Sequence, residues 1–140
     1  MEKFVGRLPN EIILRIISYT YSLQDKTLLN DIVNYTESKT KMFNLYHQRW
    51  IIEMSEQEPE DKNWLINDII AYANNYQATM YGYVDKFYNI FKRNIFLQTN
   101  EQIRKYVFKL QGSHVNKEIN IYLGLLTPNE RNDVILNSLL

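Results

Sequence analysis

The chain has 140 residues, and its 16 Lys and Arg residues balance 16 Asp and Glu residues, so its formal net charge is zero. Nucleic-acid-binding domains usually carry a basic excess, so the balance argues against nucleic acid as the main partner. The absence of cysteine excludes disulfides, thiolate metal sites and cysteine nucleophiles. No apolar run is long enough to span a membrane, and the N-terminal residues lack the apolar region of a signal peptide. We therefore expect an intracellular protein with no membrane partner.

Glycine and proline, which interrupt helices, occur only 4 and 3 times. Apolar residues recur at spacings of three and four rather than two, which is the helical period. The sequence thus predicts an all-α fold, a compact bundle of about seven to eight short helices in a single domain over residues 1–140.

The first predicted helix runs from Pro9 to about Tyr21. Proline suits the first helical position, where no intrahelical N–H bond is lost, and Glu11 lies favourably near the positive end of the helix dipole. The apolar stripe of this helix consists of Ile12, Ile13, Ile16 and Ile17.

Two more short helices are predicted before the first acidic stretch of the chain. One begins after Asp25, a candidate N-cap, and runs to about Tyr35. The next is capped by Thr36 or Ser38 and ends near Met54. Their apolar positions are Leu28, Leu29, Ile32 and Val33 in the one, and Met42, Leu45, Tyr46 and Trp50 in the other.

This opening third of the chain resembles the F-box, a three-helix module. The residues that carry the resemblance are Leu8-Pro9, Glu11-Ile12, Ile16, Tyr19, Leu28-Leu29, Ile32-Val33 and Trp50. It implies that residues 7–54 form an F-box-like unit that docks a Skp-type adaptor of a ubiquitin ligase. The partner-facing residues that it implies are Leu8, Pro9, Ile12, Ile16, Leu28 and Leu29. Many F-boxes carry a basic-aromatic step in the middle, where this chain has residues 35–39 without Trp. The alternative is that the Leu-Pro-x-Glu-Ile pattern only starts a helix of an ordinary core.

The acidic stretch 55–61 predicts a surface loop, after which residues 60–140 form the C-terminal helices. Asn74-Asn75 indicates a helix end, and Thr99 with Gln102 matches a capping box. Gly112 is expected as a left-handed cap, Ser113 as the next N-cap, and Thr127-Pro128-Asn129-Glu130 as the start of the last helix. The predicted apolar positions are Trp64, Leu65, Ile69, Tyr72 and Ala73; Met80, Val84, Phe87, Tyr88 and Phe91; Ile103, Val107 and Leu110; Ile119, Tyr122, Leu123 and Leu126; and Val134, Ile135 and Leu139.

An internal echo links residues 28–35 with residues 65–72 at an offset of 37, which lies in the range of helical-hairpin repeats. The two readings, two similar helix pairs or chance in an Ile-, Asn- and Tyr-rich chain, stay open.

No catalytic pattern is present in the sequence. His47 and His114 lie on different predicted elements without further ligands, so no metal site is expected, and no glycine-rich loop exists for a phosphate. Asp31 and Asp68 could be imagined as paired carboxylates, but a solvated helix face or a bond to a neighbouring helix end is the better interpretation. We expect no cofactor and no small-molecule substrate.

Residues 86–94 interleave basic and aromatic side chains, as single-strand nucleic-acid binders do. Helical spacing instead groups Val84, Phe87 and Phe91 as core, with Lys86 and Arg93 on a solvated face. The 11 tyrosines, each with an apolar ring and a polar tip, suit a protein contact surface.

The leading hypothesis is therefore a non-enzymatic protein-interaction module that docks a Skp-type adaptor. The Asn, Ile, Tyr and Lys richness suggests an AT-rich genome such as that of a large eukaryotic DNA virus, and the expected location is host cytoplasm or nucleus. The alternative hypothesis is a structural virion component, a minor capsid or capsid-associated protein packed among neighbouring capsid proteins.

Overall fold

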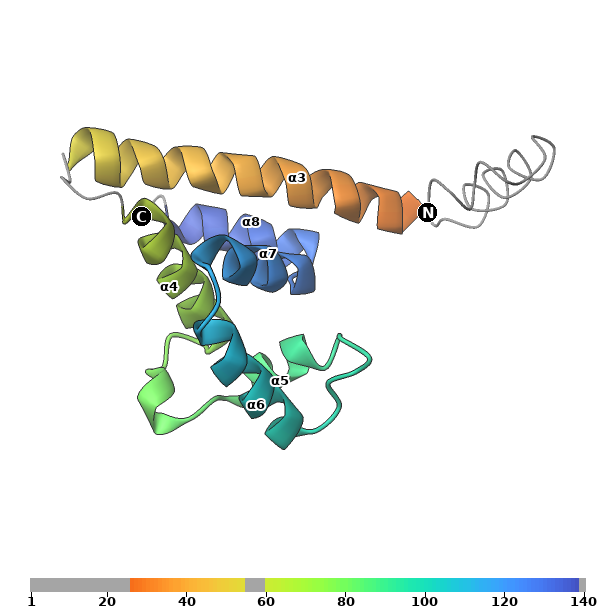
Figure 1. Ribbon diagram of the computed structural model, residues 1–140. Helices are drawn as coiled ribbons and strands as arrows, with labels where there is room; N and C mark the ends of the chain where they lie inside the picture. Colours follow the sequence, from red (N-terminus) through yellow and green to blue (C-terminus); the bar gives the residue numbers. More distant parts are fainter. Residues whose placement is uncertain (1–25, 55–59, 139–140) are drawn as a thin grey trace, which may run out of the picture. The chain divides into compact units, whose positions relative to one another are not determined.

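The computed structural model describes residues 26–54 and 60–138, and within these residues the chain is all-α, as predicted, with no strand (Figure 1). The chain divides into two compact units, residues 1–33 and 34–140. Only residues 26–33 of the first unit are described. The predicted helix over residues 9–21, the Asp25 cap and most of the acidic stretch lie outside the described residues.

The described part contains six α-helices and two short segments of other helical type, fewer α-helices than the seven to eight predicted for the whole chain. They are α3 (Lys26–Tyr46), the π-helix η1 (His47–Glu53), α4 (Asp61–Ala73), the 3₁₀ turn η2 (Thr79–Tyr81), α5 (Asp85–Phe91), α6 (Asn100–Gln111), α7 (Val115–Leu125) and α8 (Pro128–Ser138).

A single 21-residue helix, α3, occupies the place of two predicted helices. The predicted end at Tyr35 and restart at Thr36 or Ser38 is wrong. Ser38 is buried, and its hydroxyl donates to the Asn34 side chain one turn earlier, at 3.3 Å, instead of capping a new helix. No glycine or proline interrupts this stretch, so the backbone has no reason to break there.

The helix winding widens directly after α3. In η1 the Met54 N–H donates to the Arg49 carbonyl at 3.0 Å, a bond that spans five residues instead of four. Such π turns are rare and often mark functional sites. Here the wider turn places Trp50 against Trp64 of α4, with the ring centroids 4.4 Å apart and the planes 7° from parallel.

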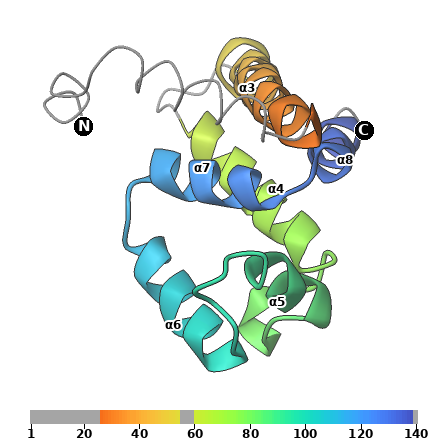
Figure 2. The same cartoon turned by 90° about the vertical axis from the view of Figure 1, so that its right-hand side faces the viewer.

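Helix α4 is the centre of the second unit, because it contacts α5, α7, α8 and η1. Figure 2 shows α4 crossing α7, with α5 and α6 at the other end of this unit. The core on both sides of α4 is apolar and aromatic, and Phe87 and Phe91 pack against Tyr122 at centroid distances of 6.3 and 5.2 Å. The fully buried members of this core are Met42, Leu65, Ile69, Ala73, Phe87, Phe91, Ile103, Ile119 and Leu123.

Three C-terminal helix boundaries agree with the sequence prediction. Helix α4 ends at Ala73 with Asn74 as its C-cap, and Asn75 and Tyr76 then take left-handed φ values of 55° and 61°. The capping box of Thr99 with Gln102 is confirmed, and so is the reciprocal pair of Thr127 and Glu130 at the start of α8.

Three boundary predictions are wrong. Met80 lies in the 3₁₀ turn η2 instead of a helix, and Gly82, at φ 102°, separates it from α5. Gly112 follows α6 but with a φ of −81°, so it is not a left-handed cap. His114, not Ser113, caps α7: its Nδ1 accepts the Asn116 N–H at 3.1 Å.

Candidate interaction surface

The structure describes two of the six predicted partner-facing residues. Leu28 and Leu29 lie in the first turn of α3. The other four, Leu8, Pro9, Ile12 and Ile16, lie outside the described residues, so the six-residue surface stays a prediction.

Leu28 and Leu29 share one side of α3 with Ile32 and Val33, because positions i, i+1, i+4 and i+5 of a helix lie together. We call these four residues the α3 apolar face. Their exposed fractions are 47, 38, 51 and 55%. Covering a half-exposed aliphatic side chain of this size would contribute about 1 kcal/mol. Four such neighbours form a patch large enough to matter in binding.

The echo segment in α4 has a different environment. Leu65, Ile66 and Ile69 are buried in the core, whereas their counterparts Leu28, Leu29 and Ile32 are exposed. The two segments therefore have similar helical patterns but different structural roles. In α4 the apolar side chains hold the second unit together, and in α3 they lie at the surface.

A second exposed apolar group, which the sequence analysis missed, lies in the loop after α5. Ile95 and Phe96 are 77 and 79% exposed. The Phe96 N–H donates to the Asn94 side chain at 2.9 Å, and the Gln98 amide donates to the carbonyls of Lys92 and Asn94. The loop therefore presents these two side chains on a hydrogen-bonded frame. The available signal was an apolar pair placed outside any helix, just before the Thr99 capping box.

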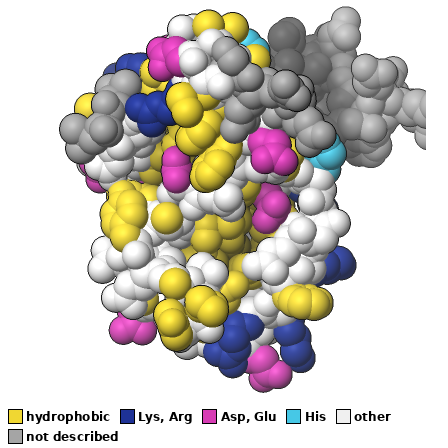
Figure 3. Space-filling model, turned by 90° about the vertical axis from the view of Figure 1, so that its left-hand side faces the viewer, with side chains coloured by type: hydrophobic (Ala, Val, Ile, Leu, Met, Phe, Trp, Pro, Cys, Tyr) yellow, Lys and Arg dark blue, Asp and Glu magenta, His cyan; other side chains and the backbone are white. Residues whose placement is uncertain are grey.

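The exposed apolar side chains are spread over several elements of the second unit. Figure 3 shows one face, on which hydrophobic side chains lie in small groups among polar ones and also line a recess near its middle. Exposed large apolar residues of this unit are Ile52, Met54, Trp64, Tyr76, Met80, Tyr81, Ile95, Phe96, Phe108 and Leu136.

The tyrosines, by contrast, mostly serve the interior. Of the nine in the described residues, Tyr46, Tyr72, Tyr88 and Tyr122 are buried, and only Tyr76 and Tyr81 are exposed. Their expected use as a contact surface stays a prediction, and Tyr76 and Tyr81 are exposed enough for it.

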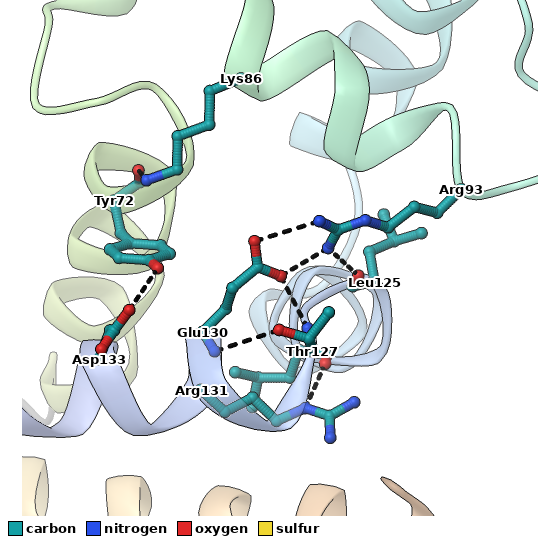
Figure 4. Close-up of polar contacts among 9 residues, drawn as sticks. Tyr72, Lys86, Arg93, Leu125, Thr127, Glu130, Arg131 and Asp133 are labelled. Atoms are coloured by element: carbon teal, nitrogen blue, oxygen red, sulfur yellow. Dashed lines mark hydrogen bonds and ion pairs between the residues drawn. The ribbon is translucent and has the colours of Figure 1, made fainter. Parts of the chain in front are cut away.

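The polar groups between α4, α5 and α8 form a cluster that is internally satisfied (Figure 4). Arg93 pairs with Glu130 at 2.6 and 3.1 Å and also donates to the Leu125 carbonyl at 2.8 Å. Lys86 donates to the Tyr72 carbonyl at 2.9 Å, and its ammonium lies 3.7 Å from the centroid of the Tyr72 ring. The predicted solvated face holds for Arg93, which is exposed while it bonds Glu130, whereas Lys86 is partly buried and joins α5 to α4.

Carboxylates in this part of the molecule accept hydrogen bonds from tyrosines. Tyr72 donates to Asp133 at 3.0 Å, and Tyr46 donates to Asp68. Burial, reinforced by these carboxylates, raises the pKa of both tyrosines well above the ordinary 10. At neutral pH they are donors and not bases. Asp68 therefore accepts a hydrogen bond from the end of a neighbouring helix, which is one of the two roles that the sequence analysis preferred for it.

The buried Arg131 is structural as well. Its Nε donates to the Leu123 carbonyl at 2.8 Å, and one terminal nitrogen donates to the Asn34 side chain at 3.1 Å. Its guanidinium also lies 5.5 Å from the centroid of the Tyr35 ring. The cation thus ties α8 to α7 and to the part of α3 that lies in the second unit.

Neither histidine shows a ligand arrangement. His114 caps α7, and His47 lies 3.9 Å from an Asp61 oxygen. No group of three or more His, Cys, Asp or Glu side chains suited to a metal occurs in residues 26–54 and 60–138. Within the same residues, no helix has the length and apolar character needed to cross a membrane.

Comparison with known proteins returned no match to a family model, to a curated protein or to a solved structure. The interpretation of this chain accordingly depends on its own residues.

Proposed function

We propose that this chain is a non-enzymatic protein-interaction module that docks a Skp-type adaptor through a surface including Leu28 and Leu29. The observation that carries the proposal is the α3 apolar face, whose four aliphatic side chains are each between 38 and 55% exposed. Soluble proteins tend to use such contiguous apolar patches as contact sites. The F-box resemblance supplies the class of partner.

The polar chemistry of the second unit supports a binding role over a catalytic one. Arg93 and Glu130 are paired with each other, and the raised pKa of Tyr72 keeps its hydroxyl protonated at neutral pH. General acid–base catalysis needs groups that can change protonation near neutral pH. The cluster instead stabilises a scaffold.

A pull-down with a purified Skp-type adaptor tests the proposal. The full chain should retain the adaptor, and the double variant Leu28→Asp/Leu29→Asp should release it. Both positions lie in the first turn of α3, where acidic side chains suit the helix dipole, so the helix should still form. Leu136→Asp is the matched control, because Leu136 is 52% exposed on α8. Leu8→Asp tests the part of the surface that the resemblance adds.

A second candidate is a structural component of a large DNA virus particle, packed among neighbouring capsid proteins. It is favoured by the exposed apolar side chains on separate elements of the second unit, such as Phe96 in the loop after α5, Phe108 on α6 and Tyr81 in η2. A protein enclosed by several neighbours needs contacts on more than one side. Mass spectrometry of purified particles decides: presence in stoichiometric amounts supports this candidate, and absence removes it.

A further inference from the structure

A groove of about 410 Å³ opens on the second unit between α4, the segment around η2, and α7. Its apolar and aromatic lining includes Ile66 and Ile70 of α4, Tyr83 before α5 and Tyr122 of α7. The side-chain amides of Asn67, Gln77 and Gln111 also line it. The groove is thus lined by apolar and polar side chains in comparable measure, and several of the polar groups are amides.

Glu118 is the one charged residue that lines this groove. It is partly buried, and its carboxylate has no hydrogen bond and no ion pair within the described residues. Burial raises the pKa of this carboxyl above its ordinary value, and no neighbouring cation offsets the effect. Glu130, another partly buried glutamate, differs because it is paired with Arg93.

An unpaired, partly buried carboxylate beside apolar walls has a defined complement. Lysine and arginine carry a cation at the end of an apolar stem, and they commonly lay that stem along apolar surface. The stem would lie on Ile66, Ile70 and Tyr83, and the cation would form a charge-assisted hydrogen bond with Glu118. The three amides could bond the backbone on either side of such a residue.

We propose that this groove binds a lysine or arginine side chain of a partner polypeptide, with Glu118 as the counter-charge. The open form of the groove and its amides favour an extended polypeptide over a free amine. The site shares no residue with the α3 apolar face, so the proposal stands whether or not Leu28 and Leu29 dock an adaptor.

An NMR titration of the full ¹⁵N-labelled chain tests the proposal. The probe is a capped pentapeptide with a central arginine among alanines, and the neutral comparison peptide carries citrulline there. The arginine peptide should shift the resonances of Ala78, Tyr83 and Glu118 along saturable curves, and the citrulline peptide should bind at least about tenfold more weakly. Equal binding of the two peptides, or no shift at these residues, overturns the proposal.

Variants and a second probe separate the other occupants. Glu118→Gln should weaken the arginine peptide by about tenfold, whereas Glu101→Gln, an exposed glutamate on α6, should leave it unchanged. If Glu118→Gln does not fold, the citrulline comparison on the unmodified chain still decides. n-Butylguanidinium binding as tightly as the peptide would overturn the polypeptide source. Groove resonances that shift with protein concentration alone would assign the groove to a second copy and likewise overturn it.

Discussion

Arg93 and Glu130 form a bidentate ion pair, with N–O distances of 2.6 and 3.1 Å, that joins the turn after α5 to the first turn of α8. The same carboxylate accepts the Thr127 N–H at 2.8 Å and so completes the cap of α8. One side chain therefore serves both the start of a helix and its attachment to another.

The Glu130 pair predicts an acid-sensitive contribution to stability. Burial alone would raise the pKa of this carboxyl, but hydrogen bonds from Arg93 and Thr127 outweigh burial and lower it below the ordinary 4.5. Because the folded-state pKa is the lower one, the contribution is present above the unfolded pKa and is lost as pH falls through the folded pKa. Glu130→Gln should therefore cost about 1 kcal/mol at pH 7 and less at low pH.

Urea unfolding at a series of pH values from 7 down to the lowest pH at which the chain still folds measures the difference in free energy of unfolding between the unmodified chain and Glu130→Gln. Glu101→Gln is the control, since the Glu101–Lys105 pair is exposed on α6 and should change little at any pH. A Glu130→Gln penalty that does not shrink on acidification would contradict the assignment.

The buried tyrosines predict the opposite dependence at high pH. Burial first, and then the Asp133 carboxylate, raise the pKa of Tyr72 above 10, and burial with Asp68 does the same for Tyr46. A raised folded-state pKa means that their contribution is complete below the unfolded pKa and is lost as pH rises toward the folded one. The free energy of unfolding should fall above pH 10, and Tyr72→Phe should make that fall shallower. Absorbance titration checks the assignment, because the ionisation step at the highest pH should be reduced in Tyr72→Phe relative to the unmodified chain.

Arg131→Met should destabilise the second unit by about 1–3 kcal/mol, because it leaves the Leu123 carbonyl without this donor and removes one of the two donors to the Asn34 side chain. Methionine keeps most of the apolar stem, so the lost free energy of unfolding reports mainly on the hydrogen bonds of the guanidinium. Thermal unfolding compared with Lys109→Met, at an exposed position on α6, provides the measurement. A change no larger than that of the control would show that the buried guanidinium is dispensable.

Asn74 has the same kind of role at the end of α4. Its side chain is fully buried, accepts the Val84 N–H at 2.8 Å and donates to the carbonyls of Gln77 and Gly82 at 2.9 and 3.3 Å. Asn74→Ala should cost about 2–3 kcal/mol and loosen residues 77–84, as measured by amide hydrogen exchange. Asn75→Ala is the comparison at the exposed neighbour; it removes no buried hydrogen bond, so its cost should be smaller and limited to the left-handed φ of 55°, which alanine adopts less readily than asparagine. Exchange rates in this segment that equal those of the unmodified chain would contradict the role given to Asn74.

The local signals in the sequence predicted local structure well. Helical spacing placed Leu65, Ile69 and Phe87 in the core, and the Thr99 and Thr127 caps lie where their patterns put them. These features depend on residues within one or two turns of each other. Prediction failed where residues distant in the sequence determine the local structure. The sequence around Ser38 is typical of an N-cap, but Ser38 is buried within α3 and the helix continues through it.

The candidate surfaces show the same limit. The α3 apolar face was visible as a helical stripe, but the nearly identical stripe in α4 is buried, so periodicity alone cannot separate a core from a docking face. Arg93 and Glu118 show the same limit for charged side chains. One charge is engaged by a residue 37 positions away, and the other, one helical turn from Tyr122, is left without a counter-ion. The spacing of residues in the sequence predicts neither the Arg93–Glu130 pair nor the lack of a counter-ion at Glu118.

The most direct test of the proposed function is the dissociation constant of a purified Skp-type adaptor for the full chain, measured by calorimetry beside Leu28→Asp/Leu29→Asp and Leu136→Asp. Our account predicts saturable binding by the unmodified chain and by Leu136→Asp, and a loss of at least about a hundredfold in the α3 double variant. No heat of binding with the unmodified chain, or equal affinity of all three proteins, would contradict it.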